Sequence, residues 1–201
     1  MQGQRKTIFA VSAVVWLGLS CAALALWPVD VLEIHLVASG RQVGTQADEH
    51  SGKDGTVFSA PMPLGAGYET SIIHSVQLTP VVDRYRVQEG RIWGWQELIK
   101  SHNAGLPALK PERGSFRHEP PWMILEGGGH SWEEIHYRVG TRTLGANMFC
   151  FPGQGCSELW RVFPGHVLRF SVTTVPLCRS VGHVASRLAL GALPLREREQ
   201  Q

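Results

Sequence analysis

The chain has 201 residues, about the length of one domain, which excludes a large multidomain enzyme. Its 19 Lys and Arg against 17 Asp and Glu give a net charge of +2, and the basic residues are scattered, so nucleic acid is excluded as a partner. With only 18% charged residues, 22 Gly and 12 Pro, the composition excludes a coiled coil or a charged disordered chain and favours turns and short strands.

The first predicted element is an uncharged apolar segment at residues 8–27. As a helix it would be about 30 Å long, which matches the hydrocarbon core of a bilayer. Arg5 and Lys6 precede the segment and Asp30 and Glu33 follow it. The positive-inside rule therefore predicts a cytoplasmic N-terminus and an exported main domain.

Residues 1–27 are predicted to be either a membrane anchor or a cleaved signal peptide. Residues 23–25 read Ala-Leu-Ala, a small-x-small cleavage pattern that would remove residues 1–25. Without cleavage the protein would be a single-pass protein of the cytoplasmic membrane with its domain facing the periplasm. With cleavage it would be periplasmic.

Residues 28–175 are expected to form an all-β exported domain, and residues 176–201 a C-terminal tail, either a short helix or a frayed end. Short runs of β-branched and aromatic residues, separated by Gly and Pro turns, predict a β-sandwich or open barrel of about seven to nine short antiparallel strands. The predicted strands are 31–37, 68–76, 81–87, 92–99, 122–125, 135–139, 159–163 and 167–172.

Three of these strands, 68–76, 81–87 and 92–99, are predicted to form a meander. A two-residue loop at Leu78-Thr79 would place His74 directly opposite Asp83.

The second turn of the meander contains Glu89 and Gly90. Because glutamate tolerates positive φ poorly, we expect a three-residue loop with Gly90 in the left-handed region, which sets Asp83 opposite Trp95. One face of the meander would then carry Ile72, His74, Val76, Val81, Asp83, Tyr85, Val87, Trp93 and Trp95.

The predicted pairing of His74 with Asp83 has two interpretations. In the first, the two side chains satisfy each other and specify the strand register. In the second, Asp83 orients His74 as a general base, as in catalytic triads. Ser75 is not a nucleophile for this histidine, because neighbouring strand residues point to opposite faces.

Cys150 and Cys156 flank a Pro and Gly turn and are predicted to form a disulfide in an exported domain. Their spacing differs from that of zinc knuckles. His130 and His136 bracket two glutamates, but this spacing matches no common metal motif. No metal and no cofactor is therefore expected.

Two further segments have alternative interpretations. The connection from 101 to 121 contains four prolines and is either a binding loop or a rigid wrap over a sheet edge. Arg84 and Arg86 are either ordinary solvated charges on the sheet or a pair that holds a carboxylate or phosphate by bidentate hydrogen bonds.

A group of short motifs resembles the bacterial family known as domain of unknown function 1850, over about residues 59–125 and more weakly to about 173. Its members are small exported or membrane-anchored proteins encoded beside TAXI-type tripartite (TRAP) solute transporters. The resemblance implies a membrane setting, with the membrane subunits or the solute-binding protein of such a transporter as partners, and implies no activity. The residues that carry it are His74, Ser75, Val76, Thr79, Pro80, Val81, Asp83, Tyr85, Gly105, Leu106 and Pro107.

Two functions follow as expectations. The first is a non-enzymatic accessory or binding domain at the outer face of the cytoplasmic membrane, associated with a TRAP-type transporter. The alternative is an exported hydrolase-like enzyme that uses His74 and Asp83.

Overall fold

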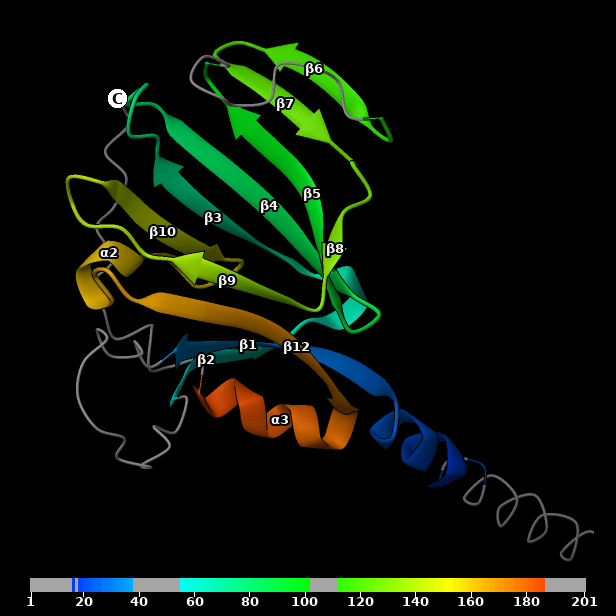
Figure 1. The fold of residues 1–201 in the computed structure, drawn as a ribbon. Helices are drawn as coiled ribbons and strands as arrows, with labels where there is room; N and C mark the ends of the chain where they lie inside the picture. The colour runs from blue at the N-terminus through cyan, green and yellow to red at the C-terminus, as the bar shows by residue number, and fades with distance from the viewer. Residues whose placement is uncertain (1–15, 17, 38–54, 102–111, 187–201) are drawn as a thin grey trace, which may run out of the picture.

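The structure is a computed structural model that describes residues 16, 18–37, 55–101 and 112–186. Strands dominate it (Figure 1). The strands are β1 (Pro28–Val37), β2 (Gly55–Pro61), β3 (Gly67–Ile73), β4 (Pro80–Gln88), β5 (Arg91–Ile99), β6 (Ser115–Glu119), β7 (Trp122–Glu126), β8 (Ser131–Trp132), β9 (Glu134–Arg138), β10 (Gly145–Phe151), β11 (Gly155–Glu158) and β12 (Val167–Pro176). Besides the helical residues 18–25, the described ranges contain the helices η1 (Pro63–Gly65), α2 (Leu159–Val162) and α3 (Leu177–Ser186).

The strands form two antiparallel sheets. The smaller has four strands in the order β2-β1-β12-β9, and the larger has eight strands in the order β11-β10-β3-β4-β5-β7-β6, with β8 paired to β5. The two sheets face each other in a sandwich-like arrangement (Figure 1). The prediction of an all-β fold is confirmed.

The main hydrophobic core lies between the two sheets. Alternating residues of β1 and β12, such as Leu32, Ile34 and Phe170, point inward and meet Tyr68 and Phe149 of the large sheet. Each of these side chains is almost fully buried, which stabilises the fold by about 1.5–3 kcal/mol per large apolar residue. The period-2 pattern of these strands therefore determines which sheet faces pack together.

Helix α3 covers the outer face of the four-stranded sheet, where it packs on β1 and β2 (Figure 1). Val29 and Val31 alternate with the inward-facing residues of β1 and are nevertheless buried. The first part of β1 is thus covered on both faces, which explains why its outward-facing positions 29 and 31 are also apolar.

A second, smaller apolar cluster lies farther along the large sheet. It consists of Val81, Ile99 and Leu125, with Ile72 and Met123 packed against it. On strands β3, β4 and β5, polar residues occupy the inner face between this cluster and the main core.

The β3–β4 turn corrects the predicted register. His74 and Thr79 close the turn, because the His74 amide donates to the Thr79 carbonyl at 2.9 Å. The turn therefore has four residues between them instead of a two-residue loop at Leu78-Thr79, and Thr70 is the residue opposite Asp83. The prediction that His74 lies opposite Asp83 is wrong.

The β4–β5 turn corrects the second register. Gln88 pairs with Arg91, so the loop has two residues, and both Glu89 (φ 55°) and Gly90 (φ 68°) have positive φ. This is the geometry of a type I′ hairpin turn. The prediction of a three-residue loop is wrong, because the right-handed twist of the strands favours this turn even with a glutamate in it.

A bulge in the same hairpin changes the sheet face to which the Trp95 side chain points. The register shifts between Arg84 and Tyr85, so that Tyr85 lies opposite Gly94 and Asp83 lies opposite Glu97. Trp95 is the extra residue, and its ring stacks against Arg86 on the outer face. The prediction that Asp83 lies opposite Trp95 is wrong.

Several element predictions also change. Residues 159–162 form helix α2 in place of the predicted strand. Strands β2, β8, β10 and β11 have no counterpart among the predicted strands, and β6 lies within the predicted connection 101–121.

The predicted membrane segment falls partly on residues 1–15 and 17, which lie outside the described residues. Residues 18–25 are helical and end just before β1. No helix in the described ranges is both long and apolar enough to cross a membrane.

Candidate functional site

Two acidic side chains face each other on the inner face of the large sheet. Asp83 of β4 is paired with Glu97 of β5, and directly opposite residues in an antiparallel pair have Cβ atoms about 4.5–5.5 Å apart. Both residues are partly buried. We call Asp83 and Glu97 the inner carboxyl pair.

The inner carboxyl pair holds a proton more tightly than ordinary carboxylates do. Burial, and secondarily the charge of Glu97, raises the pKa of Asp83 to about 7. Burial also raises the pKa of Glu97. Like charges this close resist joint ionisation, so Asp83 loses its proton only as pH rises through about 7.

Hydroxyl groups surround the inner carboxyl pair. Thr70 lies opposite Asp83 on β3, and its buried hydroxyl has no hydrogen bond of standard geometry. It nevertheless lies close enough to Tyr85 and Tyr137 to lower the pKa of both phenols. Burial has the larger effect and raises the pKa of both, so they remain neutral hydroxyls at physiological pH.

Tyr137 is a residue of the four-stranded sheet that also belongs to this site. It lies on β9, and its hydroxyl accepts a hydrogen bond of 2.9 Å from the buried side-chain amide of Asn147 on β10. The Asn147 side-chain oxygen accepts in turn from the Gly140 amide. We call Thr70, Asp83, Tyr85, Glu97, Tyr137 and Asn147 the inner polar cluster.

Aromatic rings border the cluster on one side. Tyr85 stacks on Tyr68 with ring centroids 4.9 Å apart, and Trp132 of β8 meets Tyr85 edge-on at 6.5 Å.

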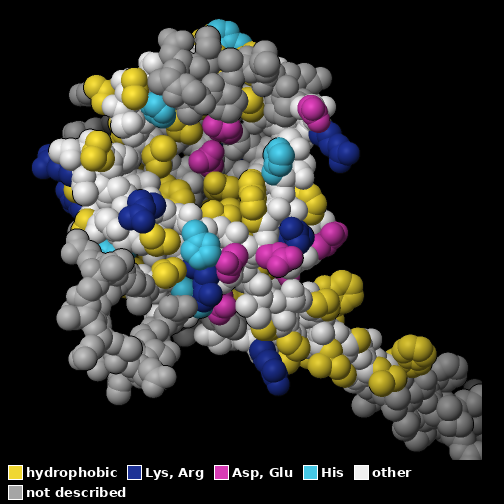
Figure 2. All heavy atoms as spheres, viewed as in Figure 1, with side chains coloured by type: hydrophobic (Ala, Val, Ile, Leu, Met, Phe, Trp, Pro, Cys, Tyr) yellow, Lys and Arg dark blue, Asp and Glu magenta, His cyan; other side chains and the backbone are white. Residues whose placement is uncertain are grey.

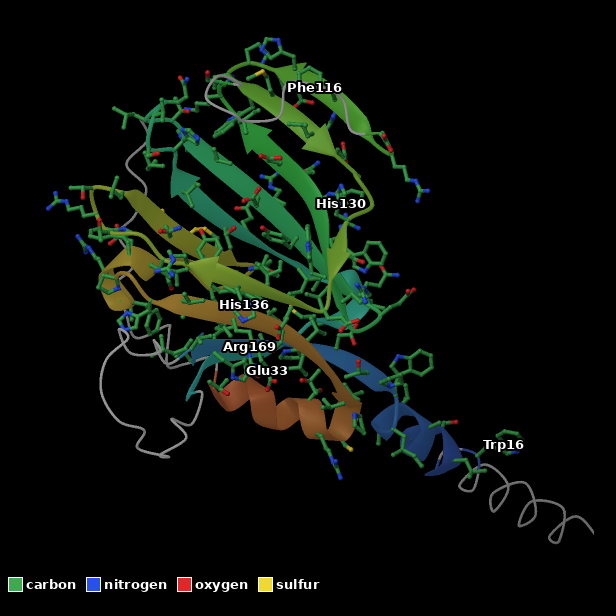
Figure 3. All side chains as sticks on the ribbon, in the orientation of Figure 1. Trp16, Glu33, Phe116, His130, His136 and Arg169 are labelled. Atoms are coloured by element: carbon green, nitrogen blue, oxygen red, sulfur yellow. A yellow bond between two sulfur atoms is a disulfide. The ribbon has the colours of Figure 1, made fainter. Side chains whose placement is uncertain are left out.

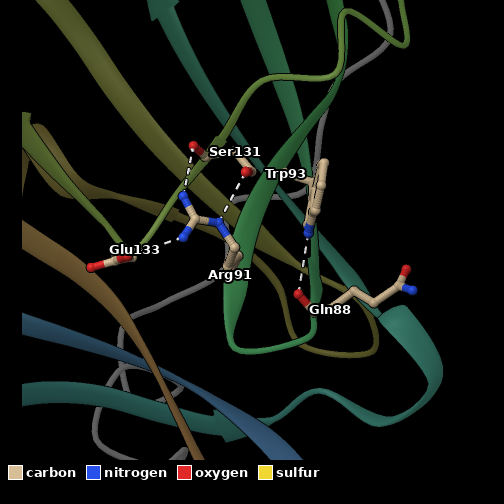
Figure 4. Close-up of polar contacts among 5 residues, drawn as sticks. All are labelled: Gln88, Arg91, Trp93, Ser131 and Glu133. Carbon is tan, nitrogen blue, oxygen red and sulfur yellow. Dashed lines mark hydrogen bonds and ion pairs between the residues drawn. The ribbon is translucent and has the colours of Figure 1, made fainter.

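Strand β8 is held in place by Arg91 (Figure 4). The Arg91 side chain donates to the Ser131 hydroxyl at 3.0 Å and to the Ser131 carbonyl at 3.3 Å. It also forms an ion pair with Glu133 at 3.0 Å. These contacts fix the segment that carries Trp132, so the ring beside Tyr85 is positioned by strand β5 itself.

The space between the sheets is open on this side of the molecule. Figure 2 shows a hollow in which acidic side chains lie beside apolar ones. Asp83, Glu97 and Tyr85 keep partial solvent exposure, so the cluster is in contact with solvent.

The histidines do not assemble a metal centre in the part of the chain that the structure describes. His130 and His136 lie well apart (Figure 3), and the carboxylate beside His136 is that of Glu134, at 3.7 Å. No group of three or more His, Cys, Asp or Glu side chains that could hold a metal occurs among the described residues.

The residues predicted from sequence are divided between the site and the β3–β4 turn. Asp83 and Tyr85 belong to the inner polar cluster. His74 closes the turn, because its ring nitrogen Nδ1 accepts from the amides of Val76 and Gln77, each at 3.3 Å.

The other motif residues lie away from the cluster or outside the description. Ser75 is exposed in the turn, while Thr79 and Pro80 lead into β4. Gly105, Leu106 and Pro107 lie outside the described residues.

Sequence reasoning missed Glu97, Thr70, Tyr137 and Asn147. Glu97 directly precedes Leu98 and Ile99, which are buried, and an acid next to buried apolar residues in a strand is a signal in itself. Because the bulge at Trp95 shifts the register, the sequence pattern did not show that Glu97 lies opposite Asp83. Tyr137 and Asn147 come from strands that are distant in sequence, so no short-range pattern identifies them.

The predicted disulfide is confirmed. Cys150 and Cys156 are bonded, with Cα atoms 4.0 Å apart, and they occupy opposite positions in the β10–β11 hairpin. Cys21 and Cys178 are free and exposed.

Comparison with known proteins supports part of the expected resemblance. Residues 69–157 match the family described as Domain of unknown function (DUF1850), which supports a domain of this family in the chain. The matched segment contains the whole inner polar cluster and the disulfide. No curated protein and no solved structure matches the chain.

Proposed function

We propose that this chain is a non-enzymatic binding module whose inner polar cluster holds a small ligand with a positively charged amine. The observation that carries the proposal is the inner carboxyl pair, Asp83 opposite Glu97 in a partly buried position. Like charges directly opposite each other destabilise a sheet. A ligand that supplies a positive charge removes this cost.

The chemistry of the cluster favours an ammonium group. Once pH rises above about 7, the pKa of Asp83, the pair carries a concentrated negative charge that a cation can neutralise. An ammonium group donates hydrogen bonds to both carboxylates, while the nearby rings of Tyr85 and Trp132 provide favourable surfaces for a cation. A metal ion is a weaker fit, because hard cations take six or more oxygen ligands.

The separation of His74 from Asp83 supports a binding role over hydrolysis by that pair. His74 directly follows the end of β3 and is four residues beyond Thr70, the residue opposite Asp83, which is roughly 13 Å of extended chain. In the described structure the His74 ring accepts hydrogen bonds from amides of the turn. The alternative of a hydrolase therefore lacks the contact between His74 and Asp83 on which it depends.

The proposed cellular setting is the outer face of the cytoplasmic membrane. The Cys150–Cys156 bond supports an oxidising compartment, and the apolar segment with basic residues before it supports export. A reporter fused after Gln201 is expected to be active only when it functions outside the cytoplasm. Activity of a cytoplasm-restricted reporter would contradict this setting.

A TRAP-type transporter of the TAXI class is the proposed partner, on the strength of the family resemblance. Purification of the tagged full-length chain from its native membrane, followed by mass spectrometry, tests this partner. We expect the membrane subunits or the solute-binding protein of the transporter to co-purify. Recovery of the chain without them would contradict the association.

The binding proposal is tested with 2-phenylethylammonium as probe and uncharged 2-phenylethanol as its control, each followed by NMR on the full-length chain. At pH 8 we expect the ammonium probe alone to shift the amides of β4 and β5. Below the pKa of Asp83 its affinity should fall by up to about tenfold per pH unit. Equal shifts with the alcohol would contradict a charge-selective site.

Matched variants locate the binding. Asp83→Asn and Glu97→Gln are each expected to weaken the ammonium probe by about tenfold or more, the effect of losing a charge-assisted contact. Glu134→Gln, on the exposed side of β9, removes the same charge elsewhere and should leave affinity unchanged. Equal affinity in Asp83→Asn and the native chain would exclude the inner carboxyl pair as the site.

A further inference from the structure

The opposite face of the large sheet carries a separate pocket. It has a volume of about 690 Å³ and is formed by η1, strands β3, β4 and β5, and the β10–β11 hairpin. Residues with side chains on this outer face include Glu69, Arg84, Arg86, Trp95 and the Cys150–Cys156 disulfide. We call it the outer-face pocket.

From its charges and geometry we infer that the outer-face pocket binds an organic carboxylate with an apolar tail. The charged residues that line it are Glu69, Arg84 and Arg86, which leaves one surplus positive charge. A monoanion matches this surplus, whereas a phosphate dianion would leave a negative charge beside Glu69.

Arg84 is already neutralised and fixed. Its Nε donates to a carboxylate oxygen of Glu69, and its Nη1 donates to the side-chain oxygen of Gln96 at 3.0 Å. Because its charge is balanced by the ion pair with Glu69, Arg84 forms part of the pocket wall and contributes little attraction for an anion.

Arg86 is the guanidinium that carries the surplus charge. It lies two residues from Arg84 on β4 and therefore on the same face. Its guanidinium carbon is 3.9 Å from the Trp95 ring centroid, and within the described residues it forms no ion pair. A guanidinium stacked on an indole retains its edge N–H groups for a bidentate bond to a carboxylate.

The remainder of the pocket suits an apolar tail. Leu64 in η1 is fully exposed, and Pro152 and the disulfide form the opposite wall. Contact with a ligand tail would remove this apolar surface from water, which is favourable. The ligand class is therefore a carboxylate whose charged end meets Arg86 and whose tail lies between Leu64 and the β10–β11 hairpin.

The probe for this site is 4-phenylbutyrate, added to the full-length chain and followed by calorimetry and NMR. We expect saturable binding, with amide shifts in β4 and the β10–β11 hairpin. The uncharged 4-phenylbutanol and the dianion phenyl phosphate should each bind about tenfold more weakly or worse. Equal binding of the alcohol would overturn the anion site, and tighter binding of the phosphate would overturn the carboxylate assignment.

Matched arginine variants provide the second arm. Arg86→Gln is expected to weaken 4-phenylbutyrate by about tenfold or more. Arg161→Gln is its control, because Arg161 also stacks on a tryptophan, Trp160, at 5.0 Å but does not line this pocket. Unchanged affinity in Arg86→Gln, with its thermal unfolding intact, would overturn the assignment.

A third variant separates this site from the inner one. Asp83→Asn removes the inner charge on the other face of β4 and should leave 4-phenylbutyrate affinity unchanged. A loss in Asp83→Asn equal to that in Arg86→Gln would place the ligand at the inner polar cluster and overturn the outer site. The proposals for the two sites can therefore be tested independently of each other.

Discussion

At the scale of single residues, Asp83 reduces the stability of the fold. A carboxyl whose pKa is raised by folding binds its proton more tightly in the native state than in the unfolded state. The native state therefore loses stability as pH rises from about 4, the ordinary aspartate value, to about 7, the pKa in the fold. Above that pH the cost is constant.

Asp83→Asn should remove this cost. We expect its free energy of unfolding to exceed that of the native chain by about 2–4 kcal/mol at pH 8, with the lower end favoured because Asp83 is partly exposed. At pH 4 the two should be nearly equal. Urea denaturation at pH 4, 6 and 8 measures the difference, and a gain of the same size at every pH would show that the Asp83 charge is not its source.

His74 acts through the β3–β4 turn. His74→Ala removes the acceptor for two turn amides and is expected to reduce stability by about 1 kcal/mol. His74→Asn, which keeps a short side-chain acceptor, should recover part of the loss. Both are measured by thermal unfolding, with binding of 2-phenylethylammonium unchanged. Loss of that binding in both variants would contradict a purely local role.

At the scale of elements, hairpin turns decided how much of the fold was predictable. The strands of the meander follow from β-branched and aromatic runs: the predictions 81–87 and 92–99 match β4 and β5 to within one residue at each end, whereas the prediction 68–76 extends three residues beyond β3. The register depends on turn length, and one residue more or less moves every partner. The sequence shows Glu89 and Gly90 but not the sheet twist that forces both into positive φ.

The site was predictable only to the extent that it is local. Asp83 and Tyr85 follow from alternation on β4. Glu97 required knowledge of the Trp95 bulge, and bulges leave little trace in a single sequence. Tyr137 and Asn147 required the packing of β9 against the large sheet, which is a property of the whole fold.

The β4–β5 turn provides a test at this scale. Glu89 has φ 55°, a conformation that asparagine tolerates better than glutamate. Glu89→Asn is expected to stabilise the chain by about 0.5–1 kcal/mol in thermal unfolding. Glu89→Ala, which removes the same charge without this tolerance, is the control. An equal gain in stability in both variants would show that the effect comes from removing the Glu89 charge and not from its backbone conformation.

At the scale of the whole molecule, the disulfide links the fold to its compartment. It closes a short loop between β10 and β11, and such a loop contributes about 2 kcal/mol by the chain-entropy model. The double variant Cys150→Ser with Cys156→Ser should therefore unfold at a lower temperature yet keep its fold. Unchanged stability would show that the bond adds nothing to this hairpin.

The two faces of the large sheet complete the description of the molecule. The inner face presents an acidic pair framed by aromatic rings, and the outer face presents an arginine on a tryptophan above a disulfide. One strand, β4, supplies Asp83 to the first site and Arg86 to the second. A cation and an anion are therefore expected to bind on opposite sides of the same strand.

The measurement that tests the inner site most directly is an NMR titration of the Asp83 and Glu97 side-chain carboxyl carbons, with and without 2-phenylethylammonium. We expect an apparent pKa for the pair near the value of about 7 shown for Asp83, and a lower one when the ammonium probe is bound, because a cation favours the charged form. Ordinary titration of both carboxyls near about pH 4, unchanged by the probe, would contradict the proposed function.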